Sequence, residues 1–178
     1  MTFKKEVNDL AQVDLISNQP SKRRMAMVDL AIQQGRTADW ILERFNGMEV
    51  RKEFTDALKE ATDYVDTKGN KSSFLSAKLK DGQTPTGKFI EAETNYLYGK
   101  LGISREARKA MKKRNKRDYF DAAQLHAVGL AEQHMAKIWK TCVKNQWTRD
   151  KAKQARTEML NRLASVQQWM QELTGEAA

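Results

Sequence analysis

The stretch that decides the fold is residues 118–173, DYFDAAQLHAVGLAEQHMAKIWKTCVKNQWTRDKAKQARTEMLNRLASVQQWMQEL. Apolar side chains recur through it at steps of three and four residues, the spacing of one face of an α-helix. We predict two long helices, over residues 118–143 and 148–173, with Asp118 and Thr148 as N-caps. Because only about four residues join them, the helices should pack as an antiparallel hairpin. The predicted stripes are Phe120, Ala123, Ala127, Leu130, Ala131, Met135, Ile138 and Cys142, then Ala152, Ala155, Met159, Leu163, Val166, Met170 and Leu173.

The rest of the chain also reads as helix. Helical spacing covers residues 3–16, 21–34, 38–45, 49–65, 88–100 and 104–113, and Asn46 and Gly47 separate the third from the fourth. Residues 67–87 lack this spacing and hold three glycines, so they form a loop, a short hairpin or a disordered linker. The predicted fold is therefore an all-α helical bundle. Its parts are an N-terminal helical unit (1–66), the loop or hairpin (67–87) and a basic C-terminal helical unit (88–178).

Composition narrows the class of protein. The 178 residues include one cysteine, which excludes an intramolecular disulfide and fits a reducing compartment. The first residues carry charges and precede no long apolar run, so we expect no signal peptide and no membrane span. These features favour a cytoplasmic protein.

Charge is distributed unevenly along the chain. Residues 1–66 carry 12 acidic and 10 basic side chains, whereas residues 67–178 carry 11 acidic and 22 basic ones. A one-sided excess of cations is typical of a surface that binds a polyanion such as nucleic acid. The alternative is a solvated basic face that only aids solubility.

Two groups of cations are candidate phosphate contacts. The first lies in residues 105–117, where eight cations face a single acid, and repulsion between neighbours on a helix would be relieved by a bound polyanion. The second surrounds the turn between the two long helices. We list both groups as candidate nucleic-acid-binding residues: Arg105, Arg108, Lys109, Lys112, Lys113, Arg114, Lys116 and Arg117, then Lys140, Lys144, Arg149, Lys151 and Lys153.

Residues 23–44 partly fit a helix-turn-helix. With Gly35 at the turn, Ala31 and Ile41 occupy positions where small and buried residues are expected. Arg36 and Arg44 do not fit, because apolar side chains are usual at their positions. A plain helical hairpin is the favoured interpretation, and the sequence does not decide between the two.

Catalytic and metal-binding patterns are weak. His126 and His134 are eight residues apart, which does not give the pair at i and i+4 that holds a metal ion on one helix face. Cys142 lies on the apolar stripe, where it is better explained as a core residue than as a nucleophile. We therefore predict no catalytic residues, no metal site and no cofactor, and an enzyme is the least favoured class.

Trp139, Trp147 and Trp169 all fall within the last two predicted helices and the turn that joins them. Packing within the hairpin explains such a concentration. A platform on which nucleic-acid bases stack is the functional alternative.

Short motifs in residues 94–157 resemble the C-terminal helical domain of phage antirepressors and of the DNA-damage-inducible D protein family. They are TNY at 94–96, YGK at 98–100, KRDYF at 116–120, GLAE at 129–132, AK at 152–153 and AR at 155–156. The resemblance implies a protein of a mobile element or stress response that acts on DNA transactions or on a repressor. Together with the charge, it predicts a non-enzymatic, nucleic-acid-associated regulatory protein of a bacterium, phage or plasmid. The alternative is an inhibitor or adaptor that docks an acidic protein surface, and the oligomeric state stays unknown.

Overall fold

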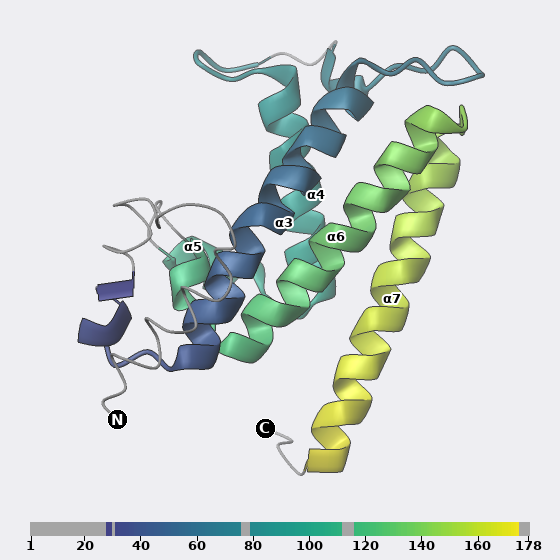
Figure 1. Cartoon of the computed structure of the whole chain (residues 1–178). Coiled ribbons are helices and arrows are strands. Elements are labelled where there is room, and N and C mark those ends of the chain that lie inside the picture. Colours follow the sequence, from purple (N-terminus) through teal and green to yellow (C-terminus); the bar gives the residue numbers. More distant parts are fainter. Residues whose placement is uncertain (1–27, 30, 76–78, 112–115, 175–178) are drawn as a thin grey trace, which may run out of the picture.

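The computed structural model describes residues 28–29, 31–75, 79–111 and 116–174, and all regular structure in them is helical. No strand occurs in these residues, so the prediction of an all-α fold is confirmed, and the described part of residues 67–87 contains no hairpin. Residues 28–29 and 31–33 are helical and precede the longer elements (Figure 1). Those elements are α3 (Ala38–Asp63), the 3-10 turn η1 (Ser73–Leu75), α4 (Pro85–Lys100), α5 (Arg105–Ala110), the 3-10 turn η2 (Lys116–Tyr119), α6 (Ala122–Lys144) and α7 (Arg149–Thr174).

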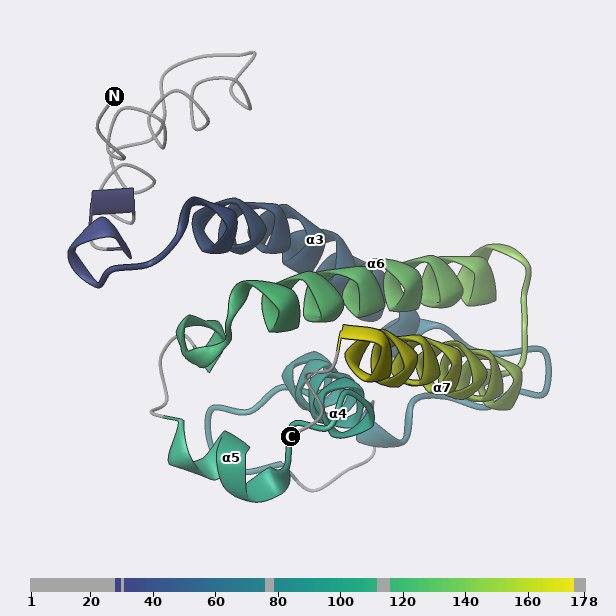
Figure 2. The ribbon, with the colours of Figure 1, turned by 90° about the horizontal axis from the view of Figure 1, so that it is seen from below.

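Helix α6 is the centre of the bundle. Its most extensive contact is with α3, and α7 returns beside it in the opposite direction, so the predicted antiparallel hairpin is confirmed (Figure 1). Helices α3 and α6 run parallel: the Trp40 indole N–H donates to the Phe120 carbonyl at one end (2.7 Å), and the Tyr64 hydroxyl donates to the Trp147 carbonyl at the other (3.0 Å). Helix α4 contacts α3, α6 and α7, and the view from below shows it beside α7 (Figure 2).

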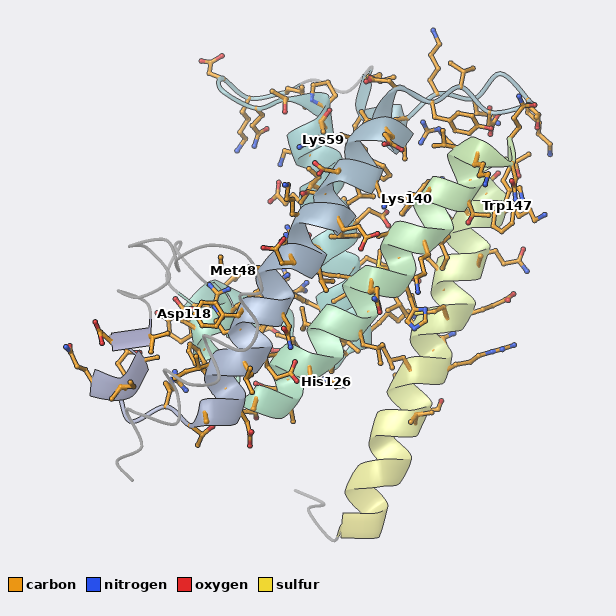
Figure 3. The ribbon with its side chains drawn as sticks, viewed as in Figure 1. Met48, Lys59, Asp118, His126, Lys140 and Trp147 are labelled. Carbon is orange, nitrogen blue, oxygen red and sulfur yellow. The ribbon has the colours of Figure 1, made fainter. Side chains whose placement is uncertain are left out.

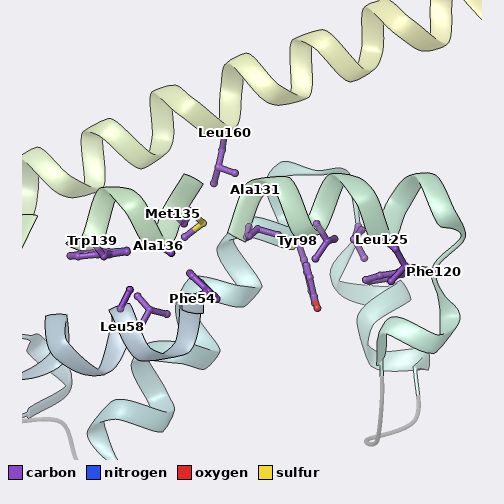
Figure 4. Close-up of a cluster of buried hydrophobic side chains, with 14 of the residues drawn as sticks. Phe54, Leu58, Tyr98, Phe120, Leu125, Ala131, Met135, Ala136, Trp139 and Leu160 are labelled. Carbon is purple, nitrogen blue, oxygen red and sulfur yellow. The ribbon is translucent and has the colours of Figure 1, made fainter. Parts of the chain in front are cut away.

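Side chains from these four helices form one hydrophobic core (Figure 4). Phe54 and Leu58 of α3 meet Met135 and Trp139 of α6, and Leu160 of α7 closes the core from the other side. Each of the five is at most 1% exposed. Burying a side chain of this size stabilises a fold by about 1.5–3 kcal/mol. The core thus includes residues from both sides of the predicted loop at 67–87.

The predicted break at Asn46 and Gly47 is wrong, because α3 continues through both residues to Asp63. Gly47 has another role. Arg117 donates from Nη1 to the Gly47 carbonyl at 2.8 Å, and a Cβ on Gly47 would lie 3.2 Å from the same nitrogen. The absence of a side chain at Gly47 therefore lets a guanidinium approach the helix backbone closely. From the sequence alone, the same glycine predicts the end of a helix.

Helix caps were predicted with mixed success. Thr148 caps α7, as expected, and accepts from the Lys151 N–H (3.3 Å). Ser104 caps α5 and accepts from the Ala107 N–H (3.0 Å). Asp118 is not the N-cap of α6. Asp121 accepts from the Gln124 N–H, and Gln124 returns a bond to the Asp121 N–H, which makes a complete capping box. Asp118 instead accepts from Arg44 Nε of α3 at 2.9 Å.

The predicted stripes are shifted at several places. Ala123 and Val166 are exposed, Val166 to 55%, whereas Leu160 was missed and is fully buried. The C-terminal part of α7 runs past the other helices in Figure 1, so apolar spacing there does not imply burial. The side chains of Met170 and Leu173 lie outside the described residues.

Around the possible helix-turn-helix, Gly35 has a positive φ of 69° and Ala31 and Ile41 are buried, as the pattern requires. The two misfitting arginines contact η2: Arg36 donates to the Asp118 carbonyl, and Arg44 pairs with the Asp118 carboxylate. Residues 23–27 lie outside the described part, and so do the predicted helices at 3–16 and most of 21–34. The choice between helix-turn-helix and helical hairpin stays open.

Candidate nucleic-acid interface

The basic run at 105–117 is only partly described. In α5, Arg105 and Lys109 are exposed, while Arg108 donates to the carbonyls of Asn95 (2.5 Å) and Ser104 (3.2 Å). Lys112, Lys113 and Arg114 lie outside the described residues, and so does the side chain of Lys116. This part of the predicted surface therefore stays a prediction.

Arg117 ends the run but belongs to the interior. Its guanidinium pairs with Glu132 of α6, which is fully buried and also accepts from Arg51 Nη1 of α3 at 2.8 Å. Burial alone would lower the pKa of Arg117, but the Glu132 charge and its hydrogen bond leave that pKa raised. The side chain of Arg117 is only 11% exposed, so this cation ties η2, α3 and α6 together and offers little to a phosphate.

Arg149, in the second predicted group, is also interior. Its side chain donates to the carbonyls of Ala61 and Tyr64, both at 2.5 Å, and its backbone N–H donates to Asp66 at 2.9 Å. The Asp66 carboxylate also accepts from Asn70 and Lys68. These donors, with the Arg149 N–H the largest cause, lower the pKa of Asp66 to about 2. The Arg149–Asp66 pair thus clamps residues 64–70 onto the start of α7.

The clamp brings five lysines to one end of the bundle. Lys144, Lys151 and Lys153 are the predicted cations of the α6–α7 turn. Lys68 lies in the clamped segment, and Lys71 follows it directly. All five are exposed, and Lys71 and Lys153 border the same cavity. Lys153 lies 3.5 Å from Asp150; the other four make no ion pair with any residue that the structure describes. We call these five residues the turn patch.

Two further predicted residues border the turn patch (Figure 3). Lys140 lies one turn earlier on α6, where its Nζ is 2.8 Å from Glu53 of α3. Trp147 is half-buried in the turn, and the Lys151 ammonium lies 4.3 Å from the centre of its ring. Trp139 belongs to the core at 1% exposure, and the side chain of Trp169 lies outside the described residues.

Sequence reasoning missed Lys68 and Lys71 because they lie far from the α6–α7 turn along the chain. Only their charge, in a segment without helical spacing, marked them. Their place depends on the Asp66 contact with the Arg149 N–H, which no local pattern predicts. Conversely, Arg117 and Arg149 were counted as surface cations from charge alone.

A second group of cations, all arginines, lines a cleft of about 620 Å³ between α3 and α4. Arg44, Arg51 and Arg117 all contribute to its wall. Each already pairs with a carboxylate of the protein, Asp118 or Glu132. Their positive charge is therefore largely offset within the fold, and the turn patch is the stronger candidate.

The residues weighed for catalysis lie apart from one another. The His126 ring is exposed and lies 3.1 Å from a Glu43 oxygen, while Cys142 is fully buried in the core, where burial raises the pKa of its thiol. Within the described ranges, no three His, Cys, Asp or Glu side chains gather as metal ligands would.

Comparison with known proteins finds no matching family model, no similar curated protein and no similar solved structure. None of the helices in the described ranges combines the length and apolar character needed to cross a membrane. The resemblance of residues 94–157 to antirepressor and D-protein domains stays a prediction.

Proposed function

We propose that the protein binds nucleic acid through phosphate contacts made by the turn patch and extended by the exposed cations of α5. The observation that carries this proposal is the convergence of Lys68 and Lys71 with Lys144, Lys151 and Lys153 at one end of the bundle. Like charges held together repel, and a polyanion relieves that repulsion while releasing its own counterions. Contacts of this kind give affinity without base specificity.

The proposed role is a non-enzymatic regulator, as the antirepressor-like motifs imply, in the cytoplasm of a bacterium or in a cell that carries a phage or plasmid. The second candidate is an inhibitor or adaptor that docks an acidic protein. The same patch supports it, since carboxylates would also satisfy exposed lysines. The two candidates differ in how binding responds to salt on duplex DNA of unrelated sequences.

The test replaces Lys68, Lys71, Lys144 and Lys151 together by glutamine and measures affinity for random-sequence duplex DNA across a range of salt concentrations. Each phosphate contact adds about −0.9 to the slope of log K against log[salt]. The wild type should show a steep slope, and the variant should flatten it by roughly three to four units. The loss should be the same for unrelated DNA sequences.

A matched control removes the same number of charges elsewhere: Lys52, Lys88, Lys137 and Arg162, all to glutamine. This control should keep most of the salt slope, because a phosphate contact is local whereas net charge acts at long range. If both variants lose the same amount of salt slope, the loss is explained by net charge alone and not by contacts of the turn patch. Absence of duplex binding by the wild type at low salt would contradict the proposal and favour the acidic-protein candidate.

A further inference from the structure

A cavity of about 570 Å³ opens beside the turn patch, between residues 70–74, α4, α6 and the start of α7. Lys71 and Lys153 of the patch line it. Its size falls within the range of about 300–1,000 Å³ typical of small-ligand sites. The proposed phosphate-binding surface therefore continues directly into this half-open cavity.

Aromatic rings form much of the wall of this cavity. Phe89 and Trp139 are buried and meet edge to face, with ring centres 5.1 Å apart. Phe74 lies against Phe89 at 5.8 Å, and Phe74 and Tyr96 are only half-buried. The partly open ring of Phe74 offers a flat surface of the kind on which nucleobases stack.

A buried ion pair completes the wall of the cavity. Glu93 is 5% exposed, accepts from the Trp139 indole N–H at 3.2 Å and pairs with Arg156, whose guanidinium lies 4.1 Å from the centre of the Tyr96 ring.

The charges around the cavity are also unbalanced. Four cations line it, Lys71, Arg149, Lys153 and Arg156, against two carboxylates, Glu93 and Asp150. Glu93 and Arg156 pair with each other, and the Arg149 guanidinium is bound by backbone carbonyls. The exposed charges at the cavity are therefore Lys71 and Lys153, with Asp150 beside Lys153. A ligand with a flat ring and a negative charge satisfies both the aromatic and the cationic parts of the wall. A nucleotide has that chemistry.

We propose that this cavity receives one nucleotide of a single-stranded nucleic acid, with its base against Phe74 and its phosphate toward Lys71 and Lys153. The proposal rests on the proposed nucleic-acid binding and adds a preference for unpaired strands, because a paired base cannot enter a cavity without leaving its stack. The shared chemistry is that of a nucleoside phosphate, whether part of a strand or free.

The test compares a single-stranded oligothymidylate with a duplex of equal length, at one salt concentration, for the wild type and for Phe74→Leu. Leucine keeps an apolar side chain against Phe89 but removes the ring. We expect single-strand affinity to fall by about 5- to 150-fold, the range for loss of one base–aromatic stack, with duplex affinity unchanged. Phe74→Tyr should restore single-strand binding, and thermal melting of both variants checks that they are folded.

Other results separate the two proposals. If the wild type and Phe74→Leu bind the single strand with the same affinity, and bind the duplex with the same affinity, the cavity proposal is overturned. Duplex binding through the turn patch then stands. If the wild type binds neither polymer, the proposed function fails, and calorimetric titration with adenosine monophosphate decides the cavity. If the wild type binds adenosine monophosphate but not inorganic phosphate, and Phe74→Leu loses this binding, the cavity is a site for free nucleotides and not for strands. Absence of binding would remove the site altogether.

Discussion

The basic run at 105–117 and the turn patch place their cations in opposite ways. In the run, charges are adjacent in sequence, yet its last residue, Arg117, pairs inside the bundle with Glu132. In the turn patch, the lysines come from two distant segments, which are joined by hydrogen bonds from Arg149 to Asp66 and Tyr64. Density of charge along a chain therefore does not measure the density of charge on its surface.

The same comparison separates arginine from lysine. Arg117 and Arg149 are buried, and each donates to several oxygens of the protein. Lys144, Lys151 and Lys109 are exposed. The guanidinium presents five donors in a planar fork and is weakly hydrated, whereas the ammonium is strongly hydrated. Arg117 and Arg149 thus belong to the frame that holds the helices together, and these lysines are exposed on its surface.

The largest effect should come from breaking the interior part of that frame. Glu132→Ala leaves Arg117 buried without its carboxylate and removes a partner of Arg51. Loss of one partner of a buried ion pair typically costs about 3–5 kcal/mol. Urea unfolding at neutral pH measures the free energy, and the folded fraction should bind DNA with an unaltered salt slope.

The matched control is Glu91→Ala on α4, which removes an exposed carboxylate paired with Lys88 at 2.8 Å. An exposed pair of this kind contributes about 0–1 kcal/mol. Similar losses of unfolding free energy in the two variants would mean that Glu132 contributes no more stability than a carboxylate on the surface. A flattened salt slope in Glu132→Ala would mean that Arg117 does reach the nucleic acid or orients groups that do.

Sequence periodicity predicted the helices better than their partners. It located α6 and α7 and their antiparallel pairing, because those helices carry regular apolar spacing and a short turn. It did not show that α6 packs mainly on α3, since that contact joins segments far apart in the chain. Leu160 was missed for a related reason: its burial depends on which neighbours surround α7, and periodicity does not identify them.

Only part of the turn patch could be predicted from the sequence. Lys144, Lys151 and Lys153 could be found because they flank one turn, and a run of cations there is visible in the sequence. Lys68 and Lys71 could not, because their position is set by hydrogen bonds to Asp66 across the fold. Burial of Arg149 follows from those same tertiary contacts.

A smaller effect, of known sign, should appear on acidification. The pKa of Asp66 is about 2 in the folded protein against an ordinary 3.8, so its contribution to stability is complete above about pH 4 and is lost as the pH falls toward 2. Asp66→Asn removes this contribution. The difference in unfolding free energy between wild type and variant should therefore be constant above about pH 4 and shrink below it.

Urea unfolding of both proteins between pH 2 and pH 6 measures this difference, with Asp150→Asn as a control that removes an exposed carboxylate near the same turn without touching the clamp. The Asp66 variant should also weaken DNA binding at neutral pH, because Lys68 and Lys71 lose their anchored position. A difference that grows on acidification would mean that the Asp66 carboxylate opposes the fold. Unaltered DNA binding would mean that these two lysines are not part of the interface.

The smallest effect distinguishes a surface ion pair from a phosphate contact. Lys140 was predicted to bind phosphate, yet its Nζ lies 2.8 Å from Glu53, and both side chains are about half exposed, at 45% and 44%. Such a pair contributes about 0–1 kcal/mol, so Glu53→Gln should leave thermal stability nearly unchanged. It would, however, free Lys140 beside the turn patch and remove a carboxylate that repels phosphate. We therefore expect slightly tighter binding to duplex DNA and a salt slope steeper by up to about 0.9, the value of one added contact.

Glu60→Gln, which removes an exposed acid of the same helix, should change neither the slope nor the stability. If Glu53→Gln leaves the slope as it was while the turn-patch variant flattens it, the interface ends at Lys144, and Lys140 is a surface partner of Glu53 only.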